Sequence, residues 1–278
     1  MLPERIVPPE WIVPPEWIVP QWPVPPQVRA LSTTRHGGVS GGSCASMNVG
    51  IAVGDDPALV AANRARLRGL LPSEPLWLVQ VHGTHVIAVD GDQAAGVADA
   101  GAGEPAPQMP QADGSITRAG GRVLVIQSAD CMPVLLAARR GGVIGAAHAG
   151  WRGLAAGIIE NVVAGMGVPA TEVVAWLGPA IGPTAYEVGQ DVFDAFVERD
   201  PAAAVAFSLR DSADGTAKSG GSKYLVDLYA LARQRLARLG VHSVFGGDYC
   251  TYCDPGRFFS YRRDNKSGRM ATVIWIEE

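Results

Sequence analysis

Residues 123–166 read VLVIQSADCMPVLLAARRGGVIGAAHAGWRGLAAGIIENVVAGM, and this stretch decides the fold. Three apolar runs, at residues 123–127, 134–138 and 143–147, are separated by short polar or glycine-containing segments, which predicts three strands. A turn of small residues then leads into residues 154–166, where apolar side chains recur at helical spacing. Strands followed by a helix in this way indicate a mixed α/β domain.

The same signals continue on both sides of this stretch. Further strands are predicted at residues 76–81 and 173–177, and further helices at residues 58–71, 189–199 and 224–239. Segments rich in small and polar residues at 90–111 and 201–222 indicate loops. No segment has the length and composition of an interdomain linker, so we expect a single α+β (mixed α/β) domain at residues 28–278 behind a tail at residues 1–27.

Composition limits the classes of function. The chain has 278 residues, of which 47% are hydrophobic and 18% charged, so it is long and apolar enough to fold around its own core. A net charge of −4 gives no global positive field, which argues against a nucleic-acid partner. Four irregularly spaced cysteines do not make a disulfide framework. With no apolar run of membrane-spanning length and no signal-peptide pattern, we expect a cytoplasmic protein without a membrane partner.

The N-terminal tail is repetitive. IVPPEW at residues 6–11 recurs at residues 12–17, and IVPQW follows at residues 18–22. This proline density favours extended or polyproline II backbone. The tail is interpreted as a short repeat expansion, either partly disordered or lying on the domain surface; the alternative is a docking segment whose Trp11, Trp17 and Trp22 contact a partner.

Three segments place a metal-binding side chain where an apolar strand gives way to small residues. They are QVHGTH with His82, SADCMPV with Cys131 and AAHAGWRG with His148. Two imidazoles and one thiolate suit Zn²⁺, and three protein ligands leave a fourth position for water or substrate, as in catalytic sites. His85 is the second choice for His82, and each of the three residues has an ordinary structural reading when it is taken singly.

Other polar segments could bind an anion or a ring. Arg152 follows small residues at a strand-to-helix turn, where backbone N–H groups are free to bind anions. The tract DPGRFFSYRRD at residues 254–264 alternates aromatic and charged side chains, which suits a heteroaromatic ring and an anion or, alternatively, a salt-bridged sheet edge. The lone CxxC of Cys250 and Cys253 fits half of a zinc site or a redox pair, and without a second CxxC it is interpreted as structural.

Together these blocks resemble the laccase-domain family, whose members are called polyphenol oxidases or purine nucleoside phosphorylases and also YfiH-like proteins. The resemblance runs from about residue 31 to the C-terminus and is carried by several blocks in the same order. These are TTRHGGVSGG with Asn48, QVHGTHV, QADGSIT, SADCMPVLL, AAHAGWRGLAAGI, WLGPAIGP with YEVG, and CTYCDPGRFFSYRRD with GRMATVIW. Gly114 and Ser115 depart from the alanine and apolar residue expected in this family, which puts local packing in doubt.

The resemblance implies mixed β-sheets sandwiched between helices, with metal ligands and catalytic residues at His82, Cys131 and His148. It also implies phosphorolysis of adenosine, inosine and methylthioadenosine to a free base and ribose 1-phosphate, with adenosine deamination as a second activity. The expected partners are a purine nucleoside and inorganic phosphate, and the expected cofactor is Zn²⁺, with Cu²⁺ as the alternative. The predicted substrate-binding residues are Arg35, Asn48, Arg152, Arg262 and Arg263.

Three other functions remain open from the sequence. A copper-dependent polyphenol oxidase follows from the older family name, but the whole chain holds only five histidines, fewer than multicopper chemistry requires. A cysteine hydrolase or amidase would use Cys131 as its nucleophile. A zinc-stabilised binding protein would dock a partner through the tryptophan repeat.

Overall fold

Two buried strands form the centre of the molecule. In the computed structural model, which describes residues 12–90, 109–210 and 222–278, β5 (Met132–Ala138) and β6 (Ile144–Ala149) pair antiparallel. Along β5, Val134 and Leu136 contact the helical side, whereas Leu135 and Ala137 face a second sheet. Because both faces are covered, the strand reads as a continuous apolar run.

These strands belong to a mixed sheet in the order β11-β7-β5-β6-β3-β2. The β11–β7 and β2–β3 pairs are parallel and the other pairs are antiparallel. Its remaining strands are β2 (Val86–Ala88), β3 (Gly114–Thr117), β7 (Val173–Leu177) and β11 (Ser243–Gly246).

A second, antiparallel sheet has the order β1-β12-β4 and is formed by β1 (Val28–Ser32), β4 (Leu124–Ser128) and β12 (Met270–Ile276). A small third sheet, in the order β8-β10-β9, contains β8 (Glu187–Val188), β9 (Phe207–Leu209) and β10 (Tyr224–Val226).

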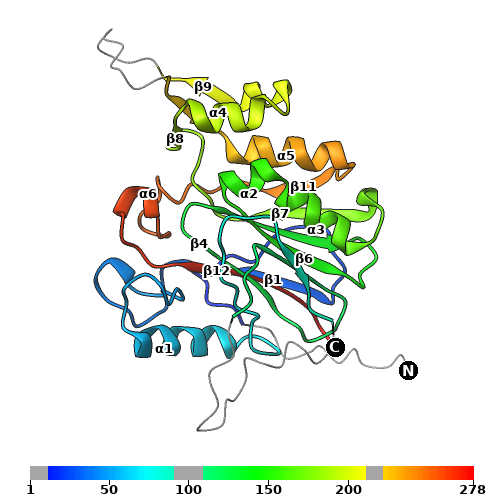
Figure 1. Cartoon of the computed structure of the whole chain (residues 1–278). Coiled ribbons are helices and arrows are strands. Elements are labelled where there is room, and N and C mark those ends of the chain that lie inside the picture. The colour runs from blue at the N-terminus through cyan, green and yellow to red at the C-terminus, as the bar shows by residue number, and fades with distance from the viewer. Residues whose placement is uncertain (1–11, 91–108, 211–221) are drawn as a thin grey trace.

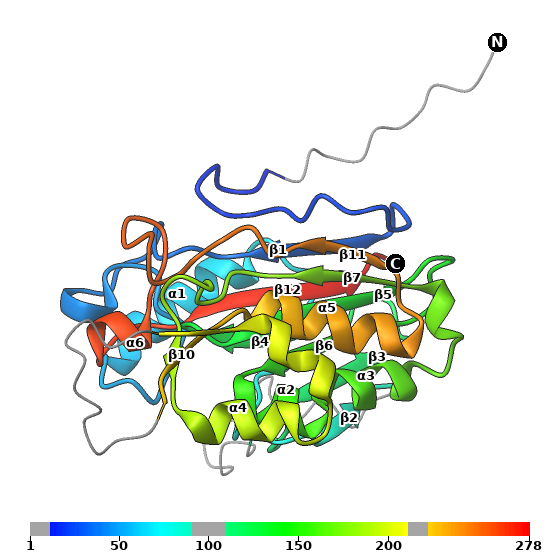
Figure 2. The ribbon, with the colours of Figure 1, turned by 90° about the horizontal axis from the view of Figure 1, so that it is seen from above.

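The helices cover the two stacked sheets from outside. The α-helices are α1 (Pro57–Arg68), α2 (Trp151–Ala156), α3 (Ile158–Met166), α4 (Gln190–Val197), α5 (Leu228–Leu239) and α6 (Tyr261–Asp264). Short 3₁₀ turns occur at η1 (Gly42–Cys44), η3 (Ala170–Glu172) and η4 (Pro201–Ala206). In Figure 1, α1 lies below the sheets, whereas α3, α4 and α5 lie above them. Figure 2 shows α2, α3, α4 and α5 on one side of the six-stranded sheet.

This layering confirms the expected mixed α/β domain with sheets sandwiched between helices. The first core lies between the six-stranded sheet and the helices, the second lies between the two sheets, and the third lies on the outer face of the β1-β12-β4 sheet. Leu67 of α1 belongs to the third core. None of the helices in the described ranges is both long and apolar enough to cross a bilayer.

The predicted helix at residues 154–166 is wrong in its continuity. Two helices, α2 and α3, meet at Gly157, whose φ of 107° lies in the left-handed region. A glycine adopts this conformation at low cost, and it ends the first helix before Ile158 starts the second. The break lets α3 lie along the sheet while α2 begins directly beside the end of β6.

Two other predicted elements also differ. The strand expected at residues 76–81 forms only isolated bridges, at Leu76 and Val79. In the helix expected at residues 224–239, the first three residues instead form β10, and Asp227 caps α5 by accepting a hydrogen bond from the Ala230 amide. Most of the two expected loops lies outside the described residues, although η4 and β9 occupy residues 201–209.

The departures from the family pattern at Gly114 and Ser115 have different consequences. A Cβ on Gly114 would lie 2.7 Å from Val162 Cγ2, so the glycine allows β3 and α3 to approach closely. Ser115 is 1% exposed, and its hydroxyl has no hydrogen-bond partner among the described residues. The helix therefore packs tightly at Gly114, at the cost of one unpaired polar group beside it.

The described part of the N-terminal tail packs against the domain. Trp17 is 7% exposed, lies in the same core as Leu31 and Trp77, and donates a hydrogen bond from Nε1 to the His36 carbonyl at 3.0 Å. Ile18 forms a two-way backbone bridge with Ser32 at the end of β1. Residues 12–27 thus contribute core contacts to the domain.

Replacing Trp17 with alanine is expected to lower the free energy of unfolding by about 3–5 kcal/mol, because a buried indole and its hydrogen bond are lost. Chemical denaturation of the full chain measures this change. Val19→Ala is the control: Val19 is 38% exposed, so its loss should cost about 0.5 kcal/mol or less. Equal midpoints for the two variants would show that the tail does not stabilise the domain.

Candidate active site

The three predicted metal ligands come together at one end of β5 and β6. Cys131 directly precedes β5, and His148 lies near the end of β6, where it pairs with Pro133. His82 lies on the loop before β2. The three ligand atoms all lie within 4.8 Å of one another, and Cys131 Sγ is 3.6 Å from His82 Nε2. Cys131 and His148 lie 49 and 66 positions after His82 in the sequence, and the fold brings the three side chains into one cluster of donors.

A buried carboxylate organises this cluster. Asp113, which is 0% exposed, accepts hydrogen bonds from the backbone amides of Val81, His82 and Gly83 at 3.2, 2.9 and 2.7 Å. Its Oδ1 also lies 2.8 Å from His148 Nδ1. This contact leaves Nε2 of His148 as the ligand atom, since metal-binding histidines usually direct their other nitrogen to such a partner.

Close approach of the ligands depends on a glycine. A Cβ on Gly150 would lie 2.8 Å from His82 Cδ2 and 2.9 Å from Cys131 Sγ, which is closer than real Cβ atoms approach. The glycines and alanines after His148 thus keep space for the donors. The ligand loop also contains a left-handed residue, because His82 has a φ of 62°. Such backbone in a non-glycine residue is typical of functional sites.

Electrostatic coupling favours a thiolate at Cys131. Burial alone would raise the pKa of its thiol, but the charge of His148 and hydrogen bonds from His148 and His82 lower that pKa to about 6. For His148, burial would lower the pKa, but the Cys131 thiolate and the Asp113 carboxylate raise it to about 9. The pKa of Asp113 falls below its ordinary value because hydrogen bonds from His148 and the Gly83 amide outweigh its burial.

The donor set fits a metal ion. A thiolate and two imidazoles are borderline-soft ligands, and thiolate is the form of cysteine that binds metal. Among the described residues, His82, Cys131 and His148 are the group of histidine, cysteine or acidic side chains close enough together to hold an ion. The exposed His85 is not part of this group. The geometry thus indicates a metal site with three protein ligands.

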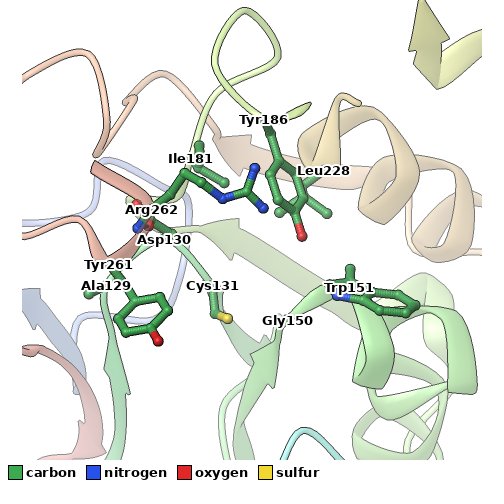
Figure 3. A pocket seen from close by; sticks show the side chains of 10 residues that line it. All are labelled: Ala129, Asp130, Cys131, Gly150, Trp151, Ile181, Tyr186, Leu228, Tyr261 and Arg262. Atoms are coloured by element: carbon green, nitrogen blue, oxygen red, sulfur yellow. Dashed lines mark hydrogen bonds between the residues drawn. The ribbon is translucent and has the colours of Figure 1, made fainter. Parts of the chain in front are cut away.

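A pocket opens beside Cys131. Its empty space is about 430 Å³, a volume that includes space open to solvent. In Figure 3, the Cys131 sulfur points toward Gly150, Trp151 and Tyr261 lie on opposite sides, and Tyr186 and Arg262 lie above. The remaining lining residues are Ala129, Asp130, Ile181 and Leu228.

Two of the predicted substrate-binding arginines are near this pocket. Arg262 lines it, its guanidinium lies 5.0 Å from the Tyr186 ring centre, and its Nη1 donates to the Glu187 carbonyl. Arg152 is exposed, and its guanidinium lies 4.4 Å from the ring centre of Trp151, another lining residue. Both positive charges therefore lie beside aromatic faces at the pocket.

The other three predicted contacts are used inside the protein. Asn48 is fully buried, and its amide bonds to Gly50, Asp55 and Arg269. Arg263 donates to the carbonyls of Thr251, Tyr252 and Phe258. Arg35 donates to the carbonyls of Ala45 and Pro255. None of the three lines the pocket of Figure 3. They hold loops together, and their contact with substrate stays a prediction.

Sequence reasoning missed three residues of this site. One is Asp113, which in the sequence is an ordinary acidic residue of the QADGSIT block. Asp130, at a φ of 90°, accepts hydrogen bonds from the Arg262 amide and the Thr251 hydroxyl, both at 2.6 Å, and so ties α6 to the residue before Cys131. Tyr186 is 8% exposed, and Figure 3 shows its hydroxyl pointing into the pocket. Of these three residues, only Asp130 has a signal in the sequence, because it is an acidic residue directly before Cys131.

Comparison with known proteins identifies the family of the chain. Residues 29–277 match the family described as multi-copper polyphenol oxidoreductase laccase. The chain belongs to this family. The predicted resemblance to laccase-domain proteins is thereby confirmed. The prediction that the protein is an enzyme of the laccase-like and purine nucleoside phosphorylase group is confirmed as well.

Curated relatives and solved structures cover nearly the whole chain. The chain is 47% identical to the purine nucleoside phosphorylase YfiH of Escherichia coli K12, over 92% of this chain and 97% of the relative. It is 49% identical to a purine nucleoside phosphorylase of Xylella fastidiosa Temecula1, over 92% and 95%. A Neisseria meningitidis protein of known structure superposes with a TM-score of 0.82 at 44% identity, covering 95% of this chain and 100% of that one. YlmD of Geobacillus stearothermophilus gives 0.75 at 32% identity, covering 91% and 93%.

Asp113→Asn is expected to weaken metal retention by about 10–100-fold, because the amide cannot accept hydrogen bonds from three backbone amides and His148 together. The measurement is metal content per chain across a series of chelator concentrations. Asp248→Asn, at an exposed position, is the control and should retain metal like the unmodified chain. Unchanged retention in Asp113→Asn would exclude a positioning role for this carboxylate.

Proposed function

We propose that this protein is a zinc-dependent purine nucleoside phosphorylase. It cleaves adenosine, inosine and methylthioadenosine with inorganic phosphate to the free base and a ribose 1-phosphate, and it deaminates adenosine as a second activity. The observation that carries the proposal is that Cys131 of the His/Cys/His donor set lines one open pocket together with aromatic side chains and Arg262. Relatives named purine nucleoside phosphorylase at 46–49% identity support the same reading.

The pocket chemistry suits a nucleoside. Trp151, Tyr186 and Tyr261 offer aromatic faces and edges to a flat heteroaromatic base. The Tyr186 hydroxyl points into the same space and can donate to a ring nitrogen or an exocyclic oxygen. Burial and the nearby Cys131 charge raise the pKa of Tyr186, so this hydroxyl keeps its proton at neutral pH. A neutral donor beside the base helps to bind it in one orientation.

The arginines provide the second substrate site. The guanidinium groups of Arg262 and Arg152 lie against the rings of Tyr186 and Trp151. A guanidinium in this setting can donate two parallel hydrogen bonds to a phosphate oxygen pair. Asp130 fixes the backbone of Arg262 through its amide, so the cation is held at a defined place. Phosphate bound there would lie beside the nucleoside rather than in bulk water.

Zinc suits the site better than copper does. The family description names several coppers, whereas the entire chain contains five histidines and the described residues form one donor cluster with two of them. A set of multiple copper sites needs more imidazoles than this. When bound, zinc supplies Lewis-acid polarisation of the base that departs in phosphorolysis or of the group displaced in deamination. His82, Cys131 and His148 would hold it.

Cys131→Ala is expected to remove bound zinc and reduce phosphate-dependent base release by roughly 100-fold or more, equivalent to about 3 kcal/mol of lost transition-state stabilisation. Elemental analysis of the purified chain and chromatography of released adenine or hypoxanthine measure the two effects. Cys44→Ala, at a buried cysteine outside the site, is the matched control and should keep zinc and turnover.

Other outcomes of this comparison identify the alternatives. Phenol oxidation with several coppers per chain would establish a polyphenol oxidase and reject the phosphorylase. A metal-free chain whose amide hydrolysis depends on Cys131 would establish a cysteine hydrolase. Retention of both zinc and nucleoside turnover by His148→Ala would remove the proposed ligand set.

Arg152→Gln is expected to raise the KM for phosphate about tenfold while kcat for the nucleoside changes little, because a charge-assisted contact to the anion is lost. Initial rates at varied phosphate give both constants. Arg140→Gln is the control, since Arg140 lies in the turn after β5, at the opposite end of this strand from Cys131, and is 88% exposed. An unchanged KM would place phosphate elsewhere.

A further inference from the structure

The CxxC pair lies in a tight turn that the proposed function does not use. Cys250 and Cys253 are free thiols, with Cys253 exposed and Cys250 half-buried. The Asp254 amide donates to the Cys250 carbonyl at 3.1 Å, which closes the turn around both cysteines. Among the described residues, neither cysteine belongs to a cluster with a third metal-binding side chain. The pair thus fits a dithiol better than half of a zinc site.

The sulfur of Cys250 is held by backbone donors. It accepts hydrogen bonds from the amides of Gly182 and Cys253, both at 3.2 Å. These two contacts fix the position of the Cys250 side chain at the edge of the turn. The Cys253 amide lies 3.2 Å from Cys250 Sγ, and the Cys250 side chain raises the pKa of the Cys253 thiol, so the two cysteine side chains are neighbours. The turn therefore brings two thiols together, one beside amide donors and the other open to solvent.

This turn is connected directly to the pocket. Thr251, between the two cysteines, donates from its hydroxyl to Asp130 at 2.6 Å and from its amide to the Ala180 carbonyl at 2.9 Å. Asp130 in turn accepts the Ile181 amide on its carbonyl, and Ile181 lines the pocket. Figure 3 shows Ile181 and Asp130 together at the pocket margin near Arg262. Residues 178–183, named here the pocket loop, thus lie between the dithiol and the site.

We propose that Cys250 and Cys253 are a redox-active dithiol that a small-molecule disulfide oxidises to an intrachain disulfide, and that this oxidation loosens the pocket loop. The exposed Cys253 loses its proton to solvent, attacks one sulfur of the small disulfide and releases the first small thiolate. Because Cys250 raises the pKa of the Cys253 thiol, this step becomes faster as the pH rises. Cys250 then attacks the Cys253 sulfur and releases the second. The two protons of the protein thiols end on the two released small thiols, and the two electrons lost by the protein reduce the small disulfide.

The expected effect on the loop follows from the Gly182 amide. In a disulfide bond the two sulfurs are about 2.05 Å apart. This distance is much shorter than that between two sulfurs that are not bonded, so at least one of the two must move. Gly182 is buried and packed against Cys250, since a Cβ on it would lie 3.0 Å from Cys250 Cβ. Its amide would then lose its partner, which destabilises the closed loop.

The test treats the full chain with increasing ratios of oxidised to reduced glutathione. Thiol counting and peptide mass analysis should show two of the four thiols lost, with Cys250 and Cys253 in one peptide that is lighter by two hydrogens. Hydrogen exchange of the pocket loop should then become faster by on the order of tenfold at the Gly182 amide. This readout is independent of any enzymatic activity.

Two single-cysteine variants serve as controls. Cys44→Ser should behave like the unmodified chain in both measurements, because Cys44 lies outside the turn. Cys253→Ser, at an exposed position, removes the first nucleophile while the fold is retained, so its pocket-loop exchange should not respond to glutathione.

Three results would overturn the proposal. They are full retention of both thiols at every glutathione ratio, a stable mixed disulfide on Cys253 in the unmodified chain, and a Cys250–Cys253 disulfide without any change in pocket-loop exchange.

Discussion

The carboxylate of Asp113 joins the two halves of the metal site by hydrogen bonds. It accepts hydrogen bonds from three consecutive backbone amides of the His82 loop, and it contacts the His148 ring on β6. A single buried charge thus fixes two ligands from different parts of the chain. A buried carboxylate is stable only if such donors surround it. The loop therefore adopts left-handed backbone at His82, and the cost of that conformation is offset by hydrogen bonds to Asp113.

The layered fold gives this carboxylate its protected position. β5 and β6 are covered on one face by the helices and on the other by the β1-β12-β4 sheet, so they are rigid up to their ends. At the end nearest the pocket, Cys131 and His148 come from adjacent strands, and Gly150 keeps space between the ligands. The ends of well-packed strands hold ligand atoms more precisely than a long loop could, and precise positions favour both metal binding and catalysis.

Residues with distinctive chemistry could be identified from the sequence, whereas residues that act through backbone contacts could not. His82, Cys131 and His148 stand out because imidazole and thiolate are rare in this chain, and short strand signals place them at strand ends. Asp113 was missed because its partners are amides about 30 positions earlier, and no spacing rule relates them. Asn48 and Arg35 are predicted from their place in a polar block, but residue type cannot show that a side chain is already bonded to nearby loops. The break at Gly157 did have a local signal, the glycine itself.

The bridge between Ile18 and Ser32 also affects how this protein meets copies of itself. β1 is the outer strand of its sheet, and an uncovered outer strand offers unpaired amides and carbonyls on which another chain can add. The segment before β1 lies at this edge and is rich in proline, which has no amide hydrogen to offer in turn. It therefore occupies the Ser32 end of this edge, and its prolines present no amide hydrogens of their own. By this argument residues 12–27 oppose the addition of another chain at the Ser32 end of β1.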